Sequence, residues 1–250
     1  MRRAIVAAML VVGLANARAQ VKLRVAAAAD LQPVMPALAQ QYARKTGVRL
    51  EMSFGSSSAL ATQIVNGAPV DVFLGADYSF PEKIVAAGLA IEKEPEPYAL
   101  GTLVVWARKD SGIRPLSVDR VTDANVKKIA IADEFHAPYG RAAVAALRWM
   151  KLYDKVRDKL VTAENVGQAA QFVETGNAQI GFISLTLAST DAMKAVGTFE
   201  RVPAVYPKMR QCGVVLKRAA NVEAAKAFMA WMRSAEVQKE LPRFGLEAAE

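Results

Sequence analysis

The residues FGSSSALATQI, at positions 54–64, place a glycine and three consecutive serines directly before a stretch with helical spacing. The first N–H groups of a helix have no partner inside the helix, and the helix dipole makes that end positive, so such a segment can bind an anion. Serine is also a common N-cap, and Ser56 and Ser57 could serve only to cap this helix. The motif therefore indicates either an oxyanion contact or a simple cap.

Three further junctions have the same character. Ala29-Asp30 follows an apolar, strand-like run, and the tripeptides PYG (138–140) and NVG (165–167) precede helix-like segments. In α/β proteins, ligands bind where the carboxyl ends of strands lead into helix N-termini. If the four junctions converge on one cleft, their N–H groups form an anion site that needs no counter-cation.

The sequence offers little for catalysis or metal binding. His136 is the single histidine and Cys212 the single cysteine, and neither a G-x-S-x-G elbow nor a nucleotide-binding glycine motif occurs. A nucleophile needs a base beside it, and a structural zinc site needs about four Cys or His ligands. We therefore expect no catalytic residues, no cofactor and no enzymatic activity.

The first 19 residues are typical of a cleaved signal peptide. Arg2 and Arg3 precede an apolar run over 4–15, and Ala17-Arg18-Ala19 is a small-x-small cleavage signal before Gln20. The run is shorter than the roughly 20 residues that span a bilayer. Export to the periplasm is expected. Removal of these residues leaves 29 basic and 24 acidic side chains, which suits a small anion; the basic residues are scattered, so nucleic acid is not an expected partner.

Strand-like and helix-like segments alternate along the remaining chain. Strands are expected at 22–29, 48–54, 70–76, 98–109, 127–133 and 178–185, and helices at 33–46, 59–66, 81–89, 141–152, 166–176, 221–234 and 235–241. This alternation predicts an α/β protein with largely parallel sheets. Segments near 98–109 and 200–216 have the character of strands that cross between lobes, which would make one lobe discontinuous.

Four stretches resemble the periplasmic molybdate-binding proteins of bacterial ABC importers. They are AAAADL (26–31), SFGSSSALATQIVNGAPVDVFLGAD (53–77), IAD followed by PYGRAAVAAL (131–147), and ENVGQAAQFVETGNAQIGFIS (164–184). The resemblance implies a two-lobed periplasmic binding protein fold of type II, with mixed, mostly parallel sheets and a two-strand hinge. It implies lobe I at 20–101 and 203–250 and lobe II at 102–202.

The resemblance also implies a set of ligand contacts. Ser57 matches a ligand-binding serine, and Val166 matches a position whose backbone N–H binds the molybdate oxyanion. Three positions depart from the family: Asp30 stands where a serine is common, Tyr139 replaces a small residue, and Ser184 stands where a tyrosine hydroxyl often reaches the ligand.

An ionised Asp30 would repel a dianion by several kcal/mol, even at an effective dielectric of about 20. Three solutions stay open. Arg141 could neutralise the carboxylate, with Lys208 and Arg210 as further candidates; Asp30 could point away and cap its own helix; or Asp30 could be protonated, or accept a hydrogen bond from a protonated ligand.

The resemblance implies a periplasmic solute-binding protein that binds molybdate, tungstate or a related oxyanion by hydrogen bonds. Its expected partners are an ABC permease and the cytoplasmic ATPase of that importer, and a monomer is expected. Because Asp30 lies in the site, the alternative is the same fold with a different ligand: an organic acid, a donor-bearing solute or a metal cation. An enzyme or sensory module on the same scaffold is the rival from a different class, since fold does not fix function.

Overall fold

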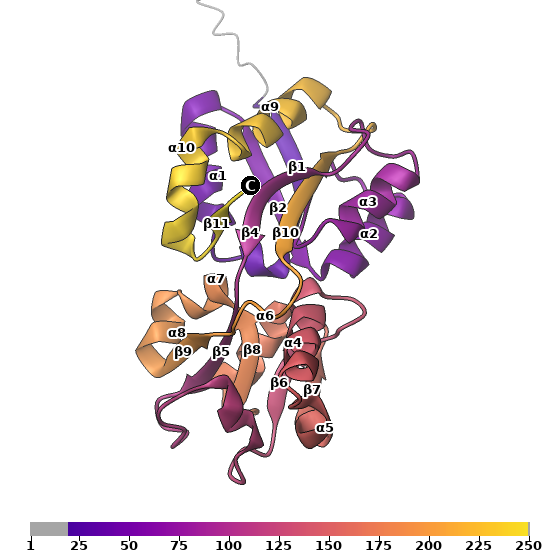
Figure 1. Ribbon diagram of the computed structural model, residues 1–250. Coiled ribbons are helices and arrows are strands. Elements are labelled where there is room, and N and C mark those ends of the chain that lie inside the picture. Colours follow the sequence, from indigo (N-terminus) through magenta and orange to yellow (C-terminus); the bar gives the residue numbers. More distant parts are fainter. Residues whose placement is uncertain (1–19, 250) are drawn as a thin grey trace, which may run out of the picture.

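The computed structural model describes residues 20–249, which form two lobes, one above the other (Figure 1). The predicted signal peptide, residues 1–19, lies outside the described residues. Among the helices of 20–249, none has the length and apolar character that crossing a membrane requires.

The upper lobe in Figure 1 is built on a six-stranded sheet with strand order β11-β4-β10-β3-β1-β2. Its strands are β1 (Lys22–Ala28), β2 (Arg49–Gly55), β3 (Val72–Gly75), β4 (Glu96–Gly101), β10 (Met209–Val215) and β11 (Glu247–Ala248). Its helical segments are η1 (Ala29–Leu31), α1 (Met35–Thr46), α2 (Ser57–Val65), α3 (Ser79–Ala86), α9 (Val222–Met232), α10 (Ala235–Glu240) and η4 (Leu241–Phe244).

The lower lobe is built on a five-stranded sheet with strand order β7-β6-β8-β5-β9. Its strands are β5 (Leu103–Arg108), β6 (Ile129–Ala132), β7 (Leu160–Ala163), β8 (Ile180–Ser184) and β9 (Gly197–Arg201). Its helical segments are η2 (Val118–Thr122), α4 (Pro138–Trp149), α5 (Tyr153–Val156), η3 (Arg157–Lys159), α6 (Val166–Glu174), α7 (Leu185–Ala188) and α8 (Asp191–Val196).

The chain crosses between the lobes twice, as expected of a two-strand hinge (Figure 1). The segment 98–109, predicted as one long strand, is two strands: β4 pairs in the upper sheet and β5 in the lower, with Thr102 between them. The second crossing is the segment 202–208 between β9 and β10. We keep the division into 20–101 with 203–250 and 102–202 as a proposal that follows the sheet membership of the strands.

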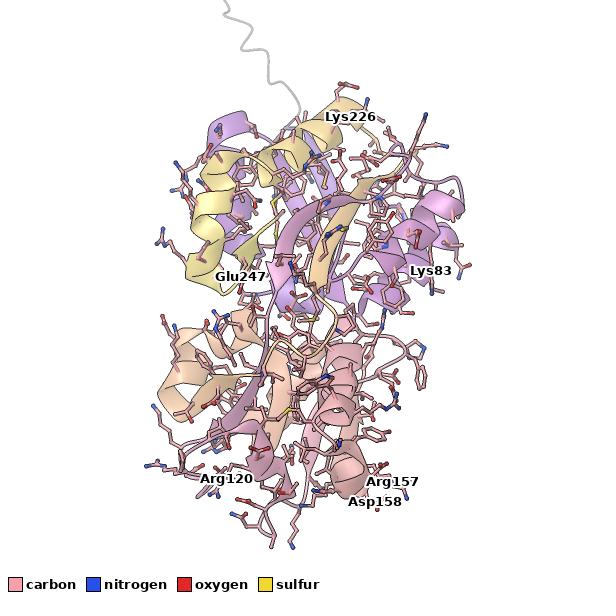
Figure 2. All side chains as sticks on the ribbon, viewed as in Figure 1. Lys83, Arg120, Arg157, Asp158, Lys226 and Glu247 are labelled. Carbon is pink, nitrogen blue, oxygen red and sulfur yellow. The ribbon has the colours of Figure 1, made fainter. Side chains whose placement is uncertain are left out.

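The C-terminal strand lies beside the hinge. Glu247 on β11, labelled at the lower edge of the upper lobe in Figure 2, accepts a hydrogen bond from Thr102 Oγ1 at 3.2 Å. Its carboxylate also pairs with Arg201 Nη1 of the lower lobe at 3.2 Å. The carboxylate is more than half exposed, so this contact contributes little to stability.

Both sheets are mixed. β1 pairs in parallel with β2 and β3, and β6 pairs in parallel with β7 and β8. The strands next to the crossings pair antiparallel: β4 with β10 and β11, and β5 with β8 and β9. Parallel pairing is thus confined to the strands that helical crossovers connect, which are the strands whose carboxyl ends face the other lobe.

Each lobe has its own apolar core. In the upper lobe, Tyr42 on α1 packs against Phe228 and Trp231 on α9, with ring centroids 5.2 and 4.9 Å away. In the lower lobe, Trp106 is fully buried, and a Cβ at Gly197 on the neighbouring strand would lie 1.8 Å from its ring. Burying side chains of this size contributes roughly 1.5–3 kcal/mol each. Each lobe is therefore stabilised by its own core and can hold the residues at the interface between the lobes in place.

Candidate functional site

A small cavity lies between the lobes, at the carboxyl ends of the parallel strands. Its free space is about 10 Å³, roughly the room that one water molecule needs. It is lined by Ala28, Ala29, Asp30, Gly55, Ser56, Ser57, Ala76, Ala137, Pro138, Tyr139, Asn165 and Val166. The four junctions identified in the sequence therefore meet at one point.

The serine motif supplies both a helix cap and a hydroxyl. Ser56 is the N-cap of α2, and its Oγ accepts a hydrogen bond from Ala59 N at 3.2 Å. Ser57 is buried in the first turn, and its Oγ accepts from Ala76 N at 3.1 Å. A hydroxyl that accepts one bond still has its own hydrogen to donate. The capping role thus falls to Ser56 and leaves Ser57 Oγ able to donate to a ligand.

The N-terminus of α4 brings Tyr139 into the cavity. Gly140 allows this approach, because a Cβ at that position would lie 2.1 Å from the carbonyl oxygen of Ala132, at the end of β6. A Cβ at Gly101 would lie 2.6 Å from the Tyr139 hydroxyl, so a second glycine makes room for the side chain. Two close approaches therefore fix the position of this fully buried ring.

The N-terminus of α6 forms the remaining wall. Asn165 caps this helix by accepting a hydrogen bond from Gln168 N at 3.0 Å, and Val166 is the first helical residue. The N–H groups of a first turn have no partner within their helix. Three helices of nine residues or more, α2, α4 and α6, thus begin at the cavity.

Asp30 is fully buried and its two oxygens have different surroundings. Its Oδ2 accepts hydrogen bonds from the Tyr139 hydroxyl at 3.1 Å and from Gln211 Nε2 at 2.5 Å. Its Oδ1 and the Oε1 of Gln211 are buried without a hydrogen-bond partner. Of these two acceptors, Asp30 Oδ1 belongs to a residue of the cavity lining.

Burial raises the pKa of Asp30 to about 6, although the hydrogen bonds from Gln211, from Tyr139 and from the backbone of Asp30 itself act in the opposite direction. Burial and the nearby Asp30 carboxylate raise the pKa of Tyr139 well above its usual value. The tyrosine hydroxyl therefore stays protonated and serves as a donor.

Gln211 is the site residue that the sequence reasoning missed. That reasoning considered Lys208 and Arg210 from the same segment as cations that might face Asp30. Successive side chains of a strand point to opposite faces, so on β10 the exposed Arg210 is followed by the fully buried Gln211. The segment MRQCGVV does not alternate regularly between polar and apolar residues, so it gave no clear signal for a buried glutamine.

Arg141 does not neutralise Asp30. Its Nη1 pairs with Asp77 Oδ2 at 3.3 Å, and it lies outside the cavity lining, in a neighbouring hollow with Lys208. The second solution is also wrong, because η1 has no side-chain cap and the Asp30 carboxyl faces Tyr139 and Gln211 instead. Protonation at Asp30, or of the ligand that it binds, stays a prediction.

Ser184 lies behind the cavity rather than in its lining. Its Oγ accepts from Leu187 N at 3.3 Å, as the cap of α7, and is 2.8 Å from Thr186 Oγ1. Thr186 in turn donates to the backbone oxygen of Asp30 at 2.7 Å. Because Thr186 belongs to the lower lobe and Asp30 to the upper, this buried bond is one of the contacts between the lobes.

A metal site finds no support in the described part of the chain. Within residues 20–249, no group of three or more His, Cys, Asp or Glu side chains gathers in a way that could hold a metal ion. The cavity instead offers N–H and O–H donors together with one carboxyl group.

Known proteins are similar to this chain over most of its length. Residues 23–247 match the family described as bacterial extracellular solute-binding protein. The molybdate-binding protein ModA of Rhodobacter capsulatus is 34% identical over 237 residues, which cover 94% of this chain and 92% of that protein. ModA of Azotobacter vinelandii is 34% identical over 233 residues, covering 93% of this chain and 92% of that protein.

Solved structures show the same fold. The periplasmic molybdate-binding protein of Azotobacter vinelandii aligns with a TM-score of 0.85 at 33% identity, covering 91% of this chain and 100% of that one. The sulfate-binding protein SubI of Mycobacterium tuberculosis aligns with a TM-score of 0.76 at 15% identity, covering 92% of this chain and 88% of that one, which shows the shared fold. The chain therefore belongs to the bacterial extracellular solute-binding protein family, and it is a solute-binding protein rather than an enzyme.

Proposed function

We propose that this protein binds molybdate, or a closely related tetrahedral oxyanion such as tungstate, in the cavity between its lobes. The observation that carries the proposal is the convergence of the N-termini of α2, α4 and α6, together with the Ser57 hydroxyl, on one buried point. The relatives named for molybdate binding, at 34% identity over more than nine tenths of the chain, support the choice of ligand.

Such a site binds its ion through hydrogen bonds alone. Hydrogen bonds to a charged group are worth about 1.5–3 kcal/mol each, and the dipoles of three helices add a favourable field. Because the cavity is shielded from water, these donors are not weakened by competing solvent. Ser57 Oγ and the Val166 N–H are the proposed contacts, and Tyr139 and Asp30 shape the other side.

The free space of about 10 Å³ is smaller than an oxyanion with four oxygens requires. A small rotation about Thr102 and the 202–208 segment would move one lobe away from the other and enlarge the cavity to the size of the ion. The ion enters when the lobes part and is surrounded by donors when they close. Delivery to the permease of an ABC importer, with its cytoplasmic ATPase, is the step that would follow in the periplasm.

A second ligand class is favoured by one observation. Asp30 lines the cavity and its Oδ1 is an unpartnered acceptor, so a solute that carries its own donor would satisfy it directly. A small organic acid with a hydroxyl or ammonium group has this character. Comparison of oxyanions with such solutes therefore belongs in the same test.

Calorimetric titration of the purified chain 20–250 with molybdate, tungstate and sulfate tests the proposal. Heat from molybdate or tungstate at micromolar concentration is expected. Ser57→Ala removes one donor to the anion and should weaken binding by about 10-fold or more, in keeping with 1.5–3 kcal/mol. Ser58→Ala is the matched control, because Ser58 lies outside the cavity lining, and it should stay within about 2-fold.

Two results would contradict the proposal. If none of the three anions produces heat, the oxyanion assignment is wrong. Equal losses in Ser57→Ala and Ser58→Ala would show that Ser57 Oγ does not contact the ion.

A further inference from the structure

The carboxyl group of Asp30 has one oxygen with no assigned use. Its Oδ2 is filled by Tyr139 and Gln211, whereas its Oδ1 is buried and has no partner. Buried polar atoms are almost always hydrogen-bonded, so an unpartnered one in the lining of a ligand cavity marks a position that a ligand atom completes.

The groups that face Asp30 bring no positive charge. Its two side-chain donors, Tyr139 and Gln211, are a neutral phenol and an amide. Burial and the Asp30 carboxylate raise the pKa of Tyr98 well above its usual value, and burial raises the pKa of the Cys212 thiol to about 12, so both are neutral as well. The remaining facing residues, by element, are Thr186 on α7, Val166 and Gly167 on α6, and Gly55 on β2, none of which titrates.

The ion pair of Asp77 with Arg141 lies outside the cavity lining. An ionised Asp30 would therefore meet a bound dianion without a counter-charge in a site shielded from water. A proton between Oδ1 and a ligand oxygen removes that repulsion. It also creates a short, charge-assisted hydrogen bond at the one unused carboxyl atom.

We propose that Asp30 Oδ1 and one oxygen of the bound oxyanion share a proton, which is taken up from solvent when the dianion binds. The charges balance: the ionised carboxylate and the dianion, with a net charge of −3, combine with one proton to give a complex with a net charge of −2. This inference rests on the proposed oxyanion function and assigns to Asp30 a role that couples ligand capture to pH.

The raised pKa of Asp30, about 6 in the unliganded protein, supports this geometry. A bound dianion raises that pKa further. Above pH 6 each unit of pH therefore makes the proton ten times scarcer, and the affinity should fall by about 10-fold per unit. Below pH 6 the carboxyl group is already protonated in the free protein, so the affinity should level off.

Calorimetry with molybdate at pH 7.5, in buffers of different ionisation enthalpy, measures the protons taken up per ion bound. The expected value for the wild-type chain is close to one, and the dissociation constant should rise about 10-fold between pH 6.5 and pH 7.5. Sulfate, which stays a dianion throughout this range, serves as the second probe. The wild-type proton count does not depend on whether any variant folds.

Asp30→Asn keeps the shape of the side chain and places an amide where the shared proton was. Its proton uptake should fall to near zero, and its affinity should become nearly independent of pH. Two controls should retain the wild-type slope: Asp77→Asn, outside the cavity lining, and His136→Gln, which removes the single histidine.

The outcomes separate this inference from the proposed function. Binding of molybdate with no proton uptake would overturn the shared proton and leave the oxyanion function intact. Retention of the uptake in Asp30→Asn, or its loss in His136→Gln, would also overturn it. Absence of binding by molybdate and sulfate from pH 5.5 to pH 8.5 would overturn the proposed function and the inference together.

Discussion

Asp30 and Asp71 are both fully buried carboxyl groups of the upper lobe, yet their surroundings differ in almost every respect. Asp30 follows the carboxyl end of β1, at the edge of the sheet that faces the other lobe. Asp71 precedes β3, which runs parallel to β1, and so lies at the opposite edge. Asp30 is thus at the carboxyl ends of the strands, where ligands bind in α/β sheets, and Asp71 is at their amino ends, which face away from the other lobe.

The partners of Asp71 fill both of its oxygens. Oδ2 accepts from Arg24 N at 2.7 Å and from Arg24 Nε at 3.2 Å, and Oδ1 accepts from Arg24 Nη2 and from Ala220 N, each at 2.9 Å. Burial by itself would raise the pKa of Asp71, but the hydrogen bonds from Arg24 and Ala220 outweigh it and hold this pKa below its usual value.

Equal burial therefore has opposite consequences. A buried carboxylate with a guanidinium and backbone donors on every lone pair is permanently charged and holds the loops around it in place. A buried carboxyl group with neutral partners and a vacant oxygen can change its charge. The first is a structural device, and the second responds to what binds beside it.

The largest loss of unfolding free energy is expected when the cation that pairs with Asp71 is removed. Arg24→Met would leave Asp71 buried without its cation. Because the Arg24 side chain is 39% exposed and the backbone donors Arg24 N and Ala220 N remain, the loss should be about 3 kcal/mol of unfolding free energy, the low end for breaking a buried pair. Urea denaturation at pH 7.5 measures the loss. The matched control is Lys22→Met on the same strand, which breaks the exposed pair with Glu51 and should cost less than about 1 kcal/mol. Similar losses in the two variants would contradict the structural assignment.

The next prediction concerns Asp30 in the unliganded protein, where a substitution should raise the unfolding free energy instead of lowering it. The pKa of Asp30 rises from 3.8 in the unfolded chain to about 6 in the fold, so the stability that its proton provides is fully present below pH 4 and is lost as pH rises through 6. A shift of this size corresponds to about 3 kcal/mol. Asp30→Asn has no carboxyl group to ionise and avoids that loss. The difference in unfolding free energy between the variant and wild type should therefore favour the variant by up to about 3 kcal/mol more at pH 8 than at pH 4.

Urea denaturation of both chains at the two pH values measures this difference. A variant whose advantage over wild type is the same at pH 4 and pH 8 would show that Asp30 does not change its charge in the fold. It would also remove the contrast with Asp71.

A smaller effect is expected at the donor that the lower lobe contributes. Tyr139→Phe removes the hydroxyl that donates to Asp30 Oδ2, and one such bond is worth about 1 kcal/mol, or about 5-fold in molybdate affinity at pH 5.5. Because that bond lowers the pKa of Asp30, its removal should also move the pH midpoint of binding upward. Tyr153→Phe, on α5 outside the site, should leave both quantities unchanged.

The smallest effect is expected at Arg141. The Arg141 side chain, which pairs with Asp77, is 44% exposed. Arg141→Gln should therefore weaken molybdate binding by less than about 1 kcal/mol, which is less than about 5-fold in affinity. The dependence of molybdate affinity on pH should keep its wild-type slope. A loss of 100-fold, or a changed slope, would restore Arg141 as the counter-cation of Asp30.

Much of this site was readable in the sequence because it lies at junctions. Strand, turn and helix N-terminus follow one another within a few residues, so the pattern indicated the junctions 55–58 and 165–167. The family resemblance then indicated Ser57 and Val166 within them. Asp30 and Tyr139 also line the cavity, although the resemblance indicated them as departures from the family pattern.

Other features depend on contacts between distant segments. Gln211 meets Asp30 across 181 positions of the chain, and only the pairing of β10 with β3 and β4 decides which face it occupies. The resemblance indicated Ser184, but the hydroxyl that contacts the backbone oxygen of Asp30 belongs to Thr186, two residues later. A sequence pattern does not distinguish two such neighbouring positions. Short elements that were not predicted include β7, α5, α7, α8 and β11, which have two to six residues each, too few for a periodic signal.

The double crossing of the hinge has a consequence for the order of assembly. The lower sheet uses strands from one uninterrupted segment, β5 to β9, so it can form before the final part of the chain has emerged during synthesis or export. The upper sheet must wait, because both neighbours of β4 are β10 and β11, the last two strands in the sequence. Gln211 arrives on β10, so the same late segment that closes the upper sheet also brings Asp30 its second donor.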